Sequence, residues 1–121
     1  MGGEGCAVHF AAANGYPPGA YRAFLEPFCE NHEVIASLHR PLWEAPPEIE
    51  SFRSWDVLGE DVGELVSQLQ QPVISVGHSM GTAAILMAAV QRPELFKSLV
   101  LIEPVIVPRR YLLGMSFFRR F

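Results

Sequence analysis

The chain has 121 residues, half of them hydrophobic, and a formal net charge of −4. This length suits one domain, and the basic residues form no long run, so nucleic-acid binding gains no electrostatic support. No apolar run reaches the roughly 18 residues of a membrane span, and the start lacks the pattern of a signal peptide. We therefore expect a cytoplasmic protein that binds neither nucleic acid nor a membrane.

The two cysteines, Cys6 and Cys29, form no C-x-x-C pair and no Cys/His spacing typical of a metal site. We expect two reduced thiols, as is usual in the cytosol, and neither a metal nor a cofactor.

In the first half of the chain, apolar runs are separated by a loop and a helical pattern. The run 6–13 predicts a buried strand, and the segment 14–19 is dense in turn residues and predicts a loop. Four apolar residues then follow at helical spacing, which predicts an amphipathic helix ending near Asn31: Tyr21, Phe24, Leu25 and Phe28. A second strand is expected at 33–38, followed by a proline-rich loop at 40–47.

The second half repeats this alternation. A helix is expected at 56–70 with Asp56 as its N-cap, then a strand at 73–76, a nearly all-apolar helix at 80–91 and a strand at 98–102. Strands that alternate with helices predict an α/β fold with a parallel sheet. We assign residues 1–104 to this core. The tail 105–121 is expected to begin a lid or cap helix, with a basic amphipathic membrane helix as the alternative.

The segment Gly77-His78-Ser79-Met80-Gly81 lies between the third strand and its helix. It matches the G-x-S-x-G nucleophile elbow, a sharp strand-to-helix turn that lifts a serine hydroxyl clear of the sheet. Gly77 and Gly81 are expected to be small because the helix crosses close to the strand there. The motif predicts acyl-group hydrolysis with Ser79 as the nucleophile.

The order of elements, with an Asn-Gly-Tyr-Pro loop, an Arg-Pro-Leu-Trp loop and Gly-His-Ser-Met-Gly, resembles the N-terminal part of an α/β-hydrolase. The resemblance covers roughly residues 6–107 and implies a partial α/β-hydrolase fold of about four strands, truncated before its C-terminal half.

An oxyanion hole needs fixed N–H donors. The elbow geometry makes the N–H of Met80 the first donor. The resemblance implies that the loop from Asn14 to Pro17 supplies the second, through the N–H of Tyr16, although Asn14 replaces the usual histidine. Asn14, Gly15, Tyr16 and Trp43 are the expected substrate-binding residues, and the named lining is apolar or aromatic.

The general base is the missing part. All four histidines precede Ser79, whereas the family order is serine, then acid, then histidine. His9 is expected in the core, His32 in solvent, His39 beside the pocket, and His78 with its side chain directed away from the serine. Glu103, directly after the fourth strand, is the candidate acid, and a carboxylate that caps a turn is its alternative.

These observations favour a serine hydrolase for a small-molecule ester, thioester or amide with an apolar acyl group, inactive as this truncated chain. The alternative is a non-catalytic binding or regulatory remnant of the same fold. A flavodoxin-like anion binder is a weaker third reading, because the elbow has neither further glycines nor a lysine.

Overall fold

The computed structural model describes residues 5–48 and 54–105. Four parallel strands form one sheet in the order β2-β1-β3-β4. Their bounds are Gly5–Ala11 for β1, His32–Ser37 for β2, Val73–His78 for β3 and Phe96–Ile102 for β4. The expected α/β architecture is therefore confirmed, and the strand ends lie within two residues of their predicted positions.

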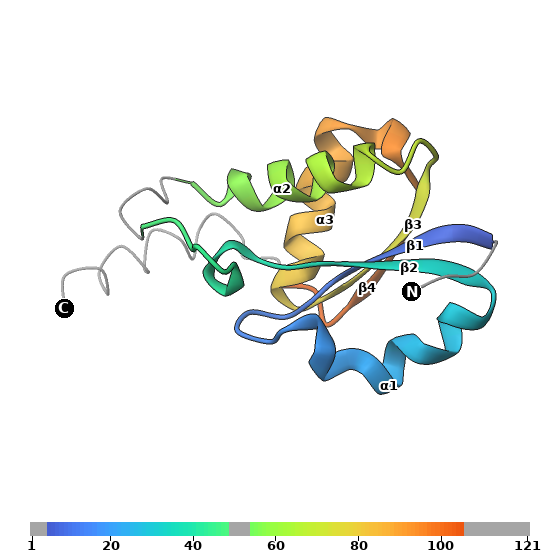
Figure 1. Ribbon diagram of the computed structural model, residues 1–121. Helices are drawn as coiled ribbons and strands as arrows, with labels where there is room; N and C mark the ends of the chain where they lie inside the picture. Colours follow the sequence, from blue (N-terminus) through green and yellow to red (C-terminus); the bar gives the residue numbers. More distant parts are fainter. Residues whose placement is uncertain (1–4, 49–53, 106–121) are drawn as a thin grey trace.

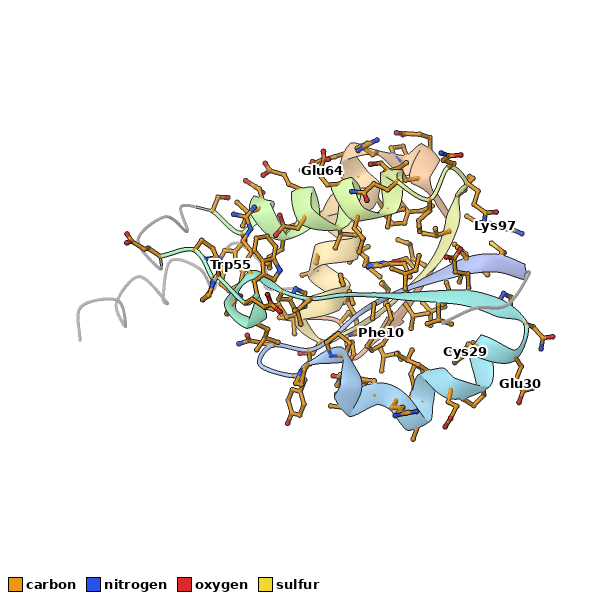
Figure 2. All side chains as sticks on the ribbon, viewed as in Figure 1. Phe10, Cys29, Glu30, Trp55, Glu64 and Lys97 are labelled. Atoms are coloured by element: carbon orange, nitrogen blue, oxygen red, sulfur yellow. The ribbon has the colours of Figure 1, made fainter. Side chains whose placement is uncertain are left out.

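Helices cover both faces of this sheet (Figure 1). Helices α2 (Asp56–Ser67) and α3 (Met80–Gln91) lie on one face, and α1 (Arg22–Leu25) lies on the other. Alternate residues of β1 enter the two cores, because successive side chains of a strand point to opposite faces. Ala7 and Ala11 pack with α2 and α3, whereas Val8 and Phe10 pack with Leu25 of α1. Figure 2 shows Phe10 between the sheet and α1.

The first helical segment differs from its prediction. One turn of α-helix, α1, lies between two 3-10 segments, η1 (Pro18–Tyr21) and η2 (Glu26–Glu30). Pro27 interrupts the pattern, because proline lacks the N–H that an α-helix needs in its interior. Leu25 is buried, whereas Phe24 and Phe28 of the expected stripe are about two-fifths exposed.

The start of α2 also differs from its prediction. Trp55 occupies the N-cap position and Asp56 is the first helical residue. The Ser54 hydroxyl accepts the N–H of Asp56 at 3.1 Å and lies 2.6 Å from its carboxylate. The negative charge of Asp56 therefore sits in the first turn, where the helix dipole favours it. The helix ends at Ser67, earlier than the predicted residue 70.

Helix α3 has the predicted bounds and packs against both the sheet and α2. One of its apolar side chains faces solvent, since Val90 is 82% exposed. Among the described residues, no helix combines the length and the hydrophobicity that a membrane crossing requires. The predicted tail lies largely outside the described residues, which end at Val105.

Candidate nucleophile elbow

Ser79 joins β3 to α3 with a strained backbone. Its φ is 51° and its ψ is −116°, a region that residues other than glycine rarely adopt. Two backbone hydrogen bonds hold this bend: the Ser79 N–H donates to the carbonyl of Ile102 at 3.0 Å, and the Ser79 carbonyl accepts the N–H of Thr82 at 3.0 Å. The Thr82 hydroxyl donates to the same carbonyl at 2.6 Å. Conformations of this kind persist where the surrounding structure fixes them, and they cluster at functional sites.

The two glycines of the motif allow α3 to start directly against the sheet. A Cβ on Gly81 would overlap the carbonyl oxygen of Ala11 and lie 2.7 Å from that of Ala12. A Cβ on Gly77 would lie 2.8 Å from the Thr82 backbone. The predicted close approach of helix and strand is therefore present at both positions.

Met80 is the first residue of α3. The N–H groups in the first turn of a helix have no intrahelical acceptor, so they are available to a ligand, and the helix dipole favours negative charge there. This position fits the predicted first oxyanion donor.

The loop after β1 lies beside the elbow. Ala11 pairs with Gly77 in the sheet, and Gly15 has a φ of 75°, which only glycine adopts easily. The N–H of Tyr16 donates to the carbonyl of Ala13 at 3.2 Å within this turn. As an oxyanion donor, Tyr16 would therefore have to share or exchange that bond. Asn14, Gly15 and Tyr16 are exposed.

Trp43 is held in the loop after β2. Its indole N–H donates to the carbonyl of Leu38 at 2.7 Å, and the Arg40 guanidinium lies 5.5 Å from its ring centre. Arg40 also makes two hydrogen bonds to Asp61 of α2, at 2.7 and 2.8 Å. The hydrogen bond to Asp61 raises the pKa of Arg40, and this two-bond ion pair joins the loop to α2.

Three of the four histidines contact a buried serine hydroxyl or a backbone carbonyl. His9 is fully buried, and its Nδ1 lies 2.7 Å from the Ser75 hydroxyl, as the core prediction required. His39 is buried, and its Nε2 lies 2.9 Å from the Ala12 carbonyl. His32 was expected in solvent but is half-buried, with Nδ1 2.9 Å from the Cys6 carbonyl.

His78 contacts two polar side chains. Its Nδ1 lies 2.7 Å from the Tyr21 hydroxyl, and its Nε2 lies 3.4 Å from Oε2 of Glu103. Glu103 has a positive φ of 48°, and its side chain is 83% exposed. The candidate acid therefore reaches the elbow, but the histidine it faces is the neighbour of Ser79. The sequence does not reveal Tyr21 as a polar contact, because its spacing with Phe24, Leu25 and Phe28 assigns it to an apolar stripe.

Cys6 and Cys29 are free thiols, and the described residues hold no group of three or more His, Cys, Asp or Glu side chains that would fit a metal ion.

The family model that describes the α/β-hydrolase fold matches residues 40–118, more than half of the chain. The chain belongs to this family. A search of curated proteins found no match to this chain.

Solved structures show the same fold at low sequence identity. An epoxide hydrolase from Vigna radiata matches with a TM-score of 0.79 and 23% identity, over 89% of this chain and 36% of its own. The N-formylmaleamic acid deformylase from Pseudomonas putida S16 matches with a TM-score of 0.75 and 22% identity, over 86% and 40%. The thioesterase domain from the curacin biosynthetic pathway matches with a TM-score of 0.79 and 20% identity, over 96% and 45%. The chain therefore spans less than half the length of these proteins.

Proposed function

We propose that this chain carries the nucleophile half of a serine hydrolase that cleaves an ester, thioester or amide with an apolar acyl group. The observation that supports this most is the strained backbone of Ser79 at the junction of β3 and α3. A hydroxyl at that bend stands at the carboxyl ends of the parallel strands, the edge at which open α/β sheets bind ligands.

In this proposal the Ser79 hydroxyl attacks the acyl carbon, and the leaving alcohol, thiol or amine departs with the serine's proton, which leaves an acyl-serine. Water then attacks this ester, so the acyl group leaves as the free acid and the Ser79 hydroxyl is restored. The oxygen of the tetrahedral intermediate meets the Met80 N–H and, after its turn bond is exchanged, the Tyr16 N–H. Asn14, Gly15 and Trp43 border the acyl group. The reaction requires no cofactor, since the serine, a base and the oxyanion donors suffice.

In this proposal the chain lacks the general base. A serine hydroxyl is a weak nucleophile at neutral pH, and no histidine follows Ser79 in the sequence. We therefore propose that the chain alone reacts slowly or not at all, and that a C-terminal extension with a histidine completes the site. The absent histidine also favours the alternative function, a binding or regulatory module without catalysis.

Labelling with a fluorophosphonate probe tests the proposal. A C-terminally extended form should be labelled at Ser79, and Ser79→Ala should lose the adduct entirely, because the probe needs an activated hydroxyl. The 121-residue chain should react slowly or not at all.

Ser98→Ala is the matched control, because Ser98 is an exposed serine of β4 and should leave labelling unchanged. No adduct on either form would contradict the hydrolase proposal and favour the binding module. Fast labelling of the 121-residue chain would contradict the account of the missing base.

A further inference from the structure

We propose that the Tyr21 hydroxyl is a positioning group that fixes the tautomer of His78 and fastens the loop after β1 to the elbow. The role in positioning rests on the proposed function, whereas the tautomer does not.

Four segments meet through one chain of polar contacts. The Ala13 N–H, in the loop after β1, donates to the Tyr21 hydroxyl oxygen at 3.2 Å. That oxygen lies 2.7 Å from Nδ1 of His78, the last residue of β3. Nε2 of His78 lies 3.4 Å from the Glu103 carboxylate, just past the end of β4. The tyrosine and histidine rings also meet edge to face, with centroids 5.7 Å apart.

The donors and acceptors in this chain allow one arrangement of protons for a neutral imidazole. An ionised carboxylate accepts hydrogen bonds and cannot donate them. The Nε2 of His78, which faces Glu103, must therefore carry the proton. Nδ1 is then an acceptor and receives the Tyr21 O–H. The Tyr21 oxygen remains free to accept the Ala13 N–H. We assign His78 as the Nε2–H tautomer on this basis.

The assignment has a consequence for the chemistry. Both ring nitrogens of His78 are engaged by groups other than Ser79, so His78 is not the base, although it is the nearest histidine in the sequence. The same contacts fix the position of Ala13 relative to the elbow. The Ala13 carbonyl in turn accepts the Tyr16 N–H. Tyr21 thus sets the loop that carries the proposed second oxyanion donor.

Histidine-labelled ¹⁵N NMR, at a pH high enough for the imidazole to be neutral, tests the assignment. His78, assigned with the H78Q variant, should show an unprotonated Nδ1 and a protonated Nε2. Tyr21→Phe keeps the ring and removes the hydroxyl, so His78 should become a mixture of tautomers. The Ala13 amide should then exchange with solvent about tenfold faster, as expected for one lost hydrogen bond.

Phe24→Leu is the matched control. It removes a ring that packs 5.9 Å from the centre of Phe10 and leaves the Tyr21 hydroxyl in place, so the tautomer should not change. A protonated Nδ1 in the unmodified protein would overturn the assignment, whether or not Y21F folds. An unchanged His78 spectrum in Y21F would overturn the role of the hydroxyl.

The positioning role has its own readout in the C-terminally extended form. Y21F should slow fluorophosphonate labelling of Ser79 about tenfold, because the loop after β1 loses one hydrogen bond that holds it beside the elbow. An unchanged rate, in a form that labels, would overturn the positioning role. The absence of labelling in the unmodified form would instead contradict the hydrolase proposal. The tautomer assignment would then still be tested by the NMR result alone.

Discussion

Gly81→Ala should unfold the protein or lower its free energy of unfolding by roughly 3 kcal/mol or more. The new methyl group would overlap the carbonyl oxygen of Ala11 and lie 2.5 Å from its carbonyl carbon. Those atoms belong to the end of a central strand that is hydrogen-bonded to both neighbours, so they cannot move aside. Helix α3 would have to lift from the sheet, and its buried residues Ala84 and Ile85 would lose contacts.

The control is another glycine-to-alanine change in a helix. A Cβ on Gly63, in α2, would lie 3.8 Å from the nearest side-chain atom, Cδ of Arg92. Gly63→Ala should therefore stabilise the protein by about 0.5–1 kcal/mol, since alanine restricts the unfolded chain more than glycine. Urea denaturation measures both. A Gly81→Ala protein as stable as the unmodified one would contradict the close packing of α3 on β1.

Acidification should destabilise the protein through His9. Burial, and to a smaller extent the charge of His39, lowers the pKa of His9 from 6.5 to about 4. In the unfolded chain His9 takes up its proton below pH 6.5, whereas in the folded protein it stays neutral until about pH 4. Its contribution is therefore complete above pH 6.5 and is lost as the pH falls towards 4. The gap corresponds to about 3 kcal/mol of folding free energy.

Denaturation curves between pH 7 and pH 4 measure this loss, and His9→Gln should remove most of the slope. The variant is expected to be less stable at pH 7 as well, because the Ser75 hydroxyl bonds to Nδ1 of His9 in the core. The slope, not the stability at one pH, is the diagnostic quantity. His32→Gln is the control, since His32 is only half-buried. The stability of this variant should fall with pH as steeply as that of the unmodified protein. Equal slopes for H9Q and the unmodified protein would contradict a neutral buried His9.

The parts of the fold set by strong local patterns could be predicted from the sequence. Helix α3 has the predicted bounds because a long apolar run begins at the elbow and ends before Pro93. The first helix was predicted as one element, since the spacing of Tyr21, Phe24, Leu25 and Phe28 is helical. Pro27 divides it in the structure, so the local backbone constraint outweighs the periodicity.

The backbone bend at Ser79 could be predicted, because the glycines at positions 77 and 81 require a tight crossing and leave a signature in the sequence. The surroundings of the histidines could not be predicted. The polar contact from Tyr21 to His78 joins residues 57 positions apart, and no spacing rule relates them. The turn bond of the Tyr16 N–H likewise depends on the loop conformation, which the residues Asn, Gly and Pro permit but do not fix.

Residue 79 is held in a strained elbow, and the decisive experiment compares the stability of Ser79→Gly with that of Ser79→Ala. At an ordinary position alanine is the more stabilising of the two by about 0.5–1 kcal/mol. At a φ of 51° and ψ of −116° the order should reverse, with glycine more stable than alanine by roughly 1–2 kcal/mol in urea denaturation. Ser67, at the end of α2, provides the reference pair with the ordinary order. A Ser79→Ala protein at least as stable as Ser79→Gly would contradict the elbow, and with it the proposed nucleophile.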